Sequence, residues 1–140
     1  MIYETIYKRL YRLVPHLDEI EVGNAVTLKA GGFMDLHVDV LSKGETAHAG
    51  ITFTRIALSH YYKHPSGDMI ADPDMEIKVY HDSKQRAGMA EALTYQDSFG
   101  YQEVYPDENH VRPRLKKDLN SFLSQWLKNL LQQGHRLEVE

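Results

Sequence analysis

The sequence contains no cysteine among its 140 residues. This absence excludes disulfide scaffolds, zinc sites with cysteine ligands, thiolate nucleophiles and iron–sulfur clusters held by cysteine. The fold must therefore be stabilised by a hydrophobic core. Any chemistry at a site must use oxygen and nitrogen groups.

Long apolar runs are also missing. The first ten residues mix apolar with polar and charged side chains, unlike the continuous apolar segment of a signal peptide. No later segment approaches the roughly 20 apolar residues that a membrane-spanning helix needs. We therefore expect a cytoplasmic protein that makes no membrane contact.

The chain has no basic surplus. It carries 16 Lys and Arg against 20 Asp and Glu, for a formal net charge of −4. Proteins that bind nucleic-acid backbones usually have the opposite balance, which argues against nucleic acid as a general partner. The motifs of serine hydrolases, P-loop enzymes, dinucleotide-binding folds and zinc proteases are absent as well. We expect no cofactor. The absence of these motifs argues against an enzyme.

The composition that remains is that of an ordinary globular domain. Hydrophobic residues make up 42% and charged residues 26% of the chain. A chain of this length can bury one core without metals or disulfides, and no repeat or linker divides it. We expect a single domain over residues 1–140.

Apolar periodicity predicts a helix at each end of the chain. One covers residues 2–14 and stops at Pro15. The other runs from about Pro113 to Gln133, with Gly134 suited to its end and Trp126 central on its apolar face.

Between the helices, alternation predicts about five strands. They cover residues 20–30, 34–41, 51–62, 75–80 and 89–95, with a bulge near Thr54 and Arg55 where the apolar parity changes. Short connections favour antiparallel pairing. The expected fold is α+β, an N-terminal helix, an antiparallel sheet of about five strands and a long C-terminal helix packed on the sheet.

Several segments resemble one known family. PDMEIKVYHDS, AEAL, VYPDE and KKDLNSFLSQWLKNLLQQGH occur in the order found in the YqiB-like proteins, and IYKRLYRLVP is similar to their N-terminal helix. The resemblance implies a small bacterial domain of unknown function, with no established substrate or catalytic residue to carry over. The turn after Tyr80-His81-Asp82 looks longer here than in that family.

The first candidate site joins His81, Asp82 and Glu91, with Tyr80 as a binding candidate. If Val79 pairs with Glu91, the carboxylate lies among core residues beside His81, and the two could act as an acid/base pair. If the pairing shifts by one residue, Glu91 lies opposite Lys78 as an exposed ion pair. A structural role at the turn is the simpler alternative, in which His81 and Asp82 end a strand.

The eight histidines raise the question of a metal site. His37 and Asp39 share one face of a strand, and His60 and His64 follow on the next strand. Two ligands on a polar strand face do not define a site, so we expect no metal. The series Asp68, Asp72, Asp74 lacks the spacing of a calcium loop.

A basic segment begins the last helix. It could bind an anion or, weakly, nucleic acid, although a solvated turn balanced by nearby acidic residues explains it as well. Its members are Arg112, Arg114, Lys116 and Lys117.

Three functions follow from these features. The leading one is a small non-catalytic binding or adaptor domain with a protein partner, favoured by the missing catalytic motifs and by the nine tyrosines. The alternative is a small enzyme or ligand-binding protein that uses His81, Asp82 and Glu91. Anion or nucleic-acid binding through the basic segment is third.

Overall fold

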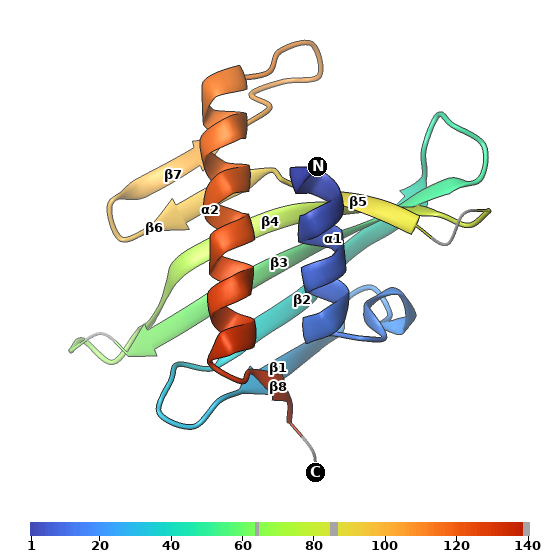
Figure 1. Cartoon of the computed structure of the whole chain (residues 1–140). Coiled ribbons are helices and arrows are strands. Elements are labelled where there is room, and N and C mark those ends of the chain that lie inside the picture. Colours follow the sequence, from blue (N-terminus) through green and yellow to red (C-terminus); the bar gives the residue numbers. More distant parts are fainter. Residues whose placement is uncertain (64, 85–86, 139–140) are drawn as a thin grey trace.

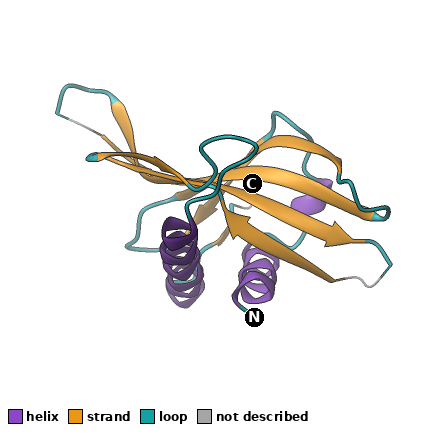
Figure 2. Ribbon diagram, turned by 90° about the horizontal axis from the view of Figure 1, so that it is seen from above, coloured by secondary structure: helices purple, strands orange, loops and turns teal. Residues whose placement is uncertain are grey.

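The computed structural model describes residues 1–63, 65–84 and 87–138 and arranges them in two layers. One layer is an antiparallel sheet, and the other consists of two helices that lie side by side across one face of it (Figures 1 and 2). The α+β class and the two terminal helices expected from the sequence are confirmed. The candidate His64 lies outside the described residues.

The first helix, α1 (Ile2–Leu13), forms because its apolar residues recur on one side. Ile6, Leu10 and Leu13 are spaced four and three residues apart and are all buried. The helix ends just before Pro15, as expected. A short 3₁₀ turn, η1 (Leu17–Glu19), follows and inserts Leu17 into the core.

The sheet has eight strands in the described part of the chain, rather than about five. Their order across the sheet is β7-β6-β4-β3-β2-β1-β8, with β5 paired to β4. The strands are β1 (Ala25–Lys29), β2 (Leu36–Glu45), β3 (Ile51–Lys63), β4 (Met69–Asp82), β5 (Ala87–Ala92), β6 (Thr94–Asp97), β7 (Gly100–Glu103) and β8 (Arg136–Leu137).

The additional strands are short ones that alternation cannot reveal. The expected strand over residues 89–95 is divided at Leu93 into β5 and β6, and β6 then forms a hairpin with β7. The two-residue β8 pairs with β1 only after the last helix has ended. Strands of two to four residues are too short to show a period of two.

The expected bulge lies on a neighbouring strand. Val40 and Ser42 of β2 pair with Ile56 and Arg55 of β3, so the extra residue is Leu41. β3 itself keeps one parity through this point, with buried Thr54 and Ile56 on its helix-covered side. The apolar parity of the sequence changes because Phe53 belongs to the opposite face, where it pairs with Gly44.

The second helix, α2 (Pro113–Gln132), covers the rest of the same sheet face. Its buried apolar residues are Leu119, Leu123, Trp126, Leu127 and Leu130. Trp126 is 9% exposed, which confirms its expected place in the core. No helix in the described ranges is both long and apolar enough to cross a bilayer.

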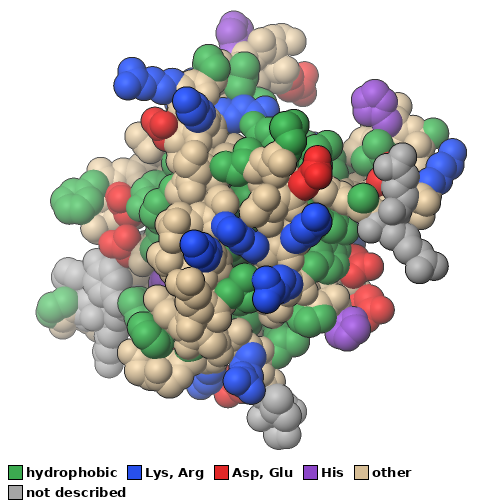
Figure 3. Space-filling view, viewed as in Figure 1, with side chains coloured by type: hydrophobic (Ala, Val, Ile, Leu, Met, Phe, Trp, Pro, Cys, Tyr) green, Lys and Arg blue, Asp and Glu red, His purple; other side chains and the backbone are tan. Residues whose placement is uncertain are grey.

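Charge is divided unequally between helices and the rest of the chain. The two helices carry seven Lys and Arg against two Asp and Glu, and the remaining sequence carries nine against eighteen. The helix-bearing side of the molecule accordingly shows several Lys and Arg side chains (Figure 3). The sheet and its loops therefore hold the protein's negative charge.

Candidate functional site

The pairing of β4 with β5 decides which candidate residues meet. Lys78 lies opposite Glu91, and His81 lies opposite Gly88. Because side chains alternate along a strand, Glu91 and His81 point to opposite faces of the sheet. The register with Val79 opposite Glu91 is not formed, since Val79 pairs instead with the buried Ala90. His81, Asp82 and Glu91 are therefore not one cluster.

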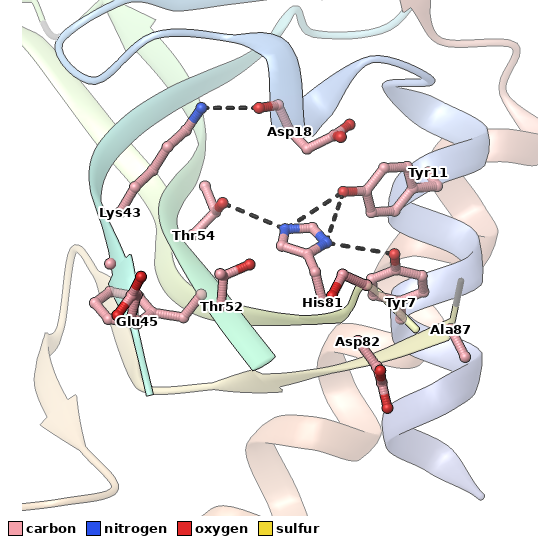
Figure 4. Close-up of a pocket in the computed structure, with 13 residues that line it drawn as sticks. Tyr7, Tyr11, Asp18, Lys43, Glu45, Thr52, Thr54, His81, Asp82 and Ala87 are labelled. Atoms are coloured by element: carbon pink, nitrogen blue, oxygen red, sulfur yellow. Dashed lines mark hydrogen bonds between the residues drawn. The ribbon is translucent and has the colours of Figure 1, made fainter. Parts of the chain in front are cut away.

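His81 faces the helix layer and lines a cleft of about 600 Å³. The cleft lies between α1 and the ends of β2, β3 and β4 (Figure 4). Such a volume falls within the range of roughly 300 to 1,000 Å³ that small-molecule sites occupy. Its polar and aromatic lining consists of Tyr7, Tyr11, Asp18, Lys43, Glu45, Thr52, Phe53, Thr54, His81, Asp82 and Ser83.

Three hydroxyl groups surround the imidazole of His81. The Tyr11 hydroxyl lies 3.1 Å and the Tyr7 hydroxyl 3.4 Å from Nδ1, while Thr54 Oγ1 lies 3.3 Å from Nε2. Tyr7 and Tyr11 are one helical turn apart in α1, and their ring centroids are separated by 4.6 Å. The imidazole is thus fixed between α1 and β3.

Gly88 permits this close approach of helix and sheet. A Cβ atom at residue 88 would collide with the Tyr7 ring and with the backbone oxygen of Tyr80. Only glycine leaves room for the Tyr7 ring over β5. The packing of α1 and the position of the Tyr7 hydroxyl therefore depend on the same residue.

Burial keeps these groups uncharged. It lowers the pKa of the His81 imidazole, an effect that the charge of Asp18 partly opposes and the charge of Lys43 adds to. Burial raises the pKa of the Tyr7 and Tyr11 phenols, and the negative charge of Asp18 raises both further. At neutral pH the cleft therefore presents a neutral imidazole and two neutral phenols, each able to donate and accept hydrogen bonds.

Charged groups stand around this neutral centre. Two carboxylates, those of Asp18 and Glu45, line the cleft together with one ammonium group, that of Lys43. Asp82 lies at the edge, where its carboxylate points away from His81 and accepts a hydrogen bond from the backbone N–H of Lys84 (Figure 4). Lys43 Nζ donates a 2.8 Å hydrogen bond to the backbone oxygen of Asp18, which ties η1 to β2 (Figure 4). The lining is therefore net negative.

Glu91 belongs to a second group at the far side of the hairpin. The Tyr105 hydroxyl donates to Glu91, and Lys116 Nζ donates to the Tyr105 hydroxyl over 2.9 Å. Burial and the charge of Glu91 raise the pKa of nearby Tyr80. Three of the sequence candidates, Tyr80, Glu91 and Lys116, thus meet here, where they hold the segment after β7 against α2.

The basic segment does not form one continuous patch. Lys116 is engaged with Tyr105, and Arg112 donates to the backbone oxygen of Glu103 over 3.2 Å. Arg114 and Lys117 are exposed on the first turns of α2. Two of the four cations therefore have structural contacts that explain them.

The histidines considered as metal ligands lie on different faces of the sheet. His37 packs against Tyr61 on the face without helices, with Asp39 two residues away on the same strand. His60 packs against Trp126 of α2, and burial lowers its pKa. Among the described residues, no three His, Asp or Glu side chains are grouped so that they could hold a metal ion.

Sequence reasoning missed most of the cleft. Tyr7 and Tyr11 lie one helical turn apart in the predicted N-terminal helix, but neither is among the candidate site residues of the sequence. Thr54, which is 2% exposed, and Lys43 are polar residues on the helix-covered side of strands, a position that only the pairing identifies. The inconsistent parity around Thr54 was the available signal.

Comparison with known protein families assigns the chain to one of them. A model for a domain of unknown function, DUF6908, matches residues 6–136. The chain belongs to the DUF6908 family. Comparison of this DUF6908 domain with curated proteins and with solved structures gave no match. The expectation of an uncharacterised domain is confirmed, whereas the resemblance to YqiB-like proteins is not confirmed by this match and stays a prediction.

Proposed function

We propose that this DUF6908 domain is a non-catalytic binding protein whose ligand site is the cleft around His81. The observation that carries the proposal is the neutral His81 held among the hydroxyls of Tyr7, Tyr11 and Thr54 inside a cleft of about 600 Å³. Convergent polar groups in a concave site are typical of small-ligand recognition.

The hydrogen bonds available to the His81 ring support ligand binding beside it. Each ring nitrogen of a neutral imidazole forms one well-directed hydrogen bond. Tyr11 is nearer to Nδ1 than Tyr7, and Thr54 faces Nε2. The Tyr7 hydroxyl also has a hydrogen bond with Tyr11, and a ligand could take the place of its longer contact with Nδ1.

The same geometry favours binding over catalysis. A catalytic imidazole is usually oriented by a carboxylate or carbonyl group, and it works beside a nucleophile or a substrate proton. Here both ring nitrogens face hydroxyls, and Glu91, the carboxylate expected to complete an acid/base pair, points to the other face of the sheet. The protein partner expected from the sequence stays a prediction.

A fragment screen followed by nuclear magnetic resonance tests the proposal. We expect at least one small polar compound to shift the backbone resonances of the cleft residues and to be recovered unchanged. Tyr7→Phe should weaken its binding, because the ring remains and only the hydroxyl is lost. Tyr105→Phe is the matched control, since this phenol lies outside the cleft. Compounds that shift only residues outside the cleft would refute the site.

A further inference from the structure

The charge of the cleft lining indicates what kind of ligand the site selects. Two carboxylates, those of Asp18 and Glu45, and one ammonium group line it, and burial leaves the central imidazole neutral. An anionic ligand would meet a net negative lining, whereas a cation would be attracted. The charges of Asp18 and Glu45 therefore favour a positively charged ligand.

The charge of Lys43 acts at the cleft, where it helps to lower the pKa of His81, but its ammonium group is held at one end. Its ammonium group donates to the backbone oxygen of Asp18, at the end of the cleft where η1 crosses β2 (Figure 4). In the described ranges, neither Asp18 nor Glu45 has a cationic side chain within ion-pair distance. Both carboxylates are exposed at the cleft, so a bound cation reaches them without displacing a salt bridge.

The charge of the segments around the cleft also favours a cationic ligand. The cleft is formed mainly by the sheet and its connections, and the chain outside the two helices carries eighteen Asp and Glu against nine Lys and Arg. Several Lys and Arg side chains gather on the helix-bearing face of the molecule, which is in view in Figure 3. The net charge of the chain outside the helices therefore has the same sign as Asp18 and Glu45.

Aromatic rings complete the chemistry that a cation requires. Tyr7 and Tyr11 form one wall of the cleft. Ring faces attract ammonium groups, and this protein uses that contact elsewhere, with Lys78 Nζ 4.7 Å from the Phe53 ring centre. The phenol oxygens and Thr54 can also accept hydrogen bonds from an amine.

We propose that the cleft binds a small organic cation, an aliphatic amine or diamine whose ammonium group lies between Asp18, Glu45 and the rings of Tyr7 and Tyr11. The inference rests on the proposed function and adds the ligand class to it. Neutral alcohols and carboxylate anions of the same size should bind to the cleft less tightly than the amine.

Three four-carbon compounds test the charge requirement on the full chain. They are butane-1,4-diamine, butane-1,4-diol and succinate, which have similar length and are dicationic, neutral and dianionic. Resonance shifts at the cleft residues give an affinity for each. We expect the diamine to bind at least about tenfold more tightly than the diol, and succinate not to shift these residues.

Charge-neutralising variants test the position of the ligand. Glu45→Gln and Asp18→Asn should each weaken diamine binding by a factor of about two to five, the range of an exposed ion pair. Glu108→Gln removes the same charge from an exposed residue outside the cleft and should leave the affinity unchanged. Melting temperatures of all three variants should match that of the parent, because the side chains are exposed.

The outcomes separate the inference from the proposed function. If the diol or succinate binds in the cleft as tightly as the diamine, the charge inference is wrong and the binding site stands. If the diamine shifts only residues outside the cleft, or if Glu108→Gln weakens it as much as Glu45→Gln does, the cation site is wrong. Fragments from the earlier screen then decide independently whether the cleft binds anything.

Discussion

The contact between Asn120 and β5 allows the packing of α2 on the sheet to be tested quantitatively. Asn120 is 1% exposed, and its Oδ1 accepts a 2.8 Å hydrogen bond from the backbone N–H of Ala92. Its Nδ2 donates to the backbone oxygen of Lys116 over 2.7 Å. A polar side chain inside the apolar face of α2 thus satisfies a strand N–H that no neighbouring strand reaches.

Replacing Asn120 by Ala leaves the Ala92 N–H buried without an acceptor. An unsatisfied buried donor costs about 1 to 3 kcal/mol. Alanine has a better helix propensity than asparagine, and this difference offsets up to about 0.7 kcal/mol of that cost. Asn129→Ala is a matched control, because Asn129 is an exposed residue of the same helix and has the same propensity gain.

The difference between the two variants isolates the buried hydrogen bond. We expect Asn120→Ala to be less stable than Asn129→Ala by about 1 to 3 kcal/mol in urea unfolding. For a domain of this size, each kcal/mol corresponds to a shift of about 3 to 5 °C in melting temperature. Amide exchange at Ala92 should accelerate only in Asn120→Ala. Equal stabilities within about 0.5 kcal/mol, with unchanged exchange, would refute this packing.

Three further changes test other parts of the fold. Trp126→Ala removes the large aromatic side chain from the α2 core and should cost about 3 to 5 kcal/mol in urea unfolding, so an unchanged melting temperature would contradict its burial. Gly88→Ala should cost at least about 1 to 3 kcal/mol, because its Cβ collides with Tyr7 and a backbone oxygen, whereas Gly31→Ala, with nothing within 4 Å, should be nearly neutral. His81 has a lowered pKa in the folded state, so the unfolded chain takes up the proton first as pH falls below about 6.5, and stability should decrease on acidification. The decrease should be smaller in His81→Asn, as measured by unfolding at a series of pH values, and an equal decrease would show that His81 does not contribute.

The candidate site shows where prediction from sequence ended. His81 and Asp82 were singled out, and both line the cleft. Glu91 was placed beside His81 in one of two registers, and the structure has the other. Local sequence does not choose between registers one residue apart when both strands carry mixed side chains. The choice depends on burying Val79 with Ala90 beneath α1, a contact between distant segments.

The sequence by itself determined the two helices, the long strands and the position of Trp126 in the core. Each depends on the spacing of apolar residues within one segment, and that spacing follows directly from the period of a helix or a strand. Absence of cysteine likewise restricted the chemistry without any structure.

Only the tertiary structure decided the short strands, the hairpin register and the cleft. Tyr7, Thr54 and His81 come from three segments far apart in the chain, and their approach depends on how α1 packs over Gly88. Such contacts arise from the joint burial of several elements, which no single segment encodes. Polar residues on a covered sheet face line a cleft only when a helix forms the opposite wall.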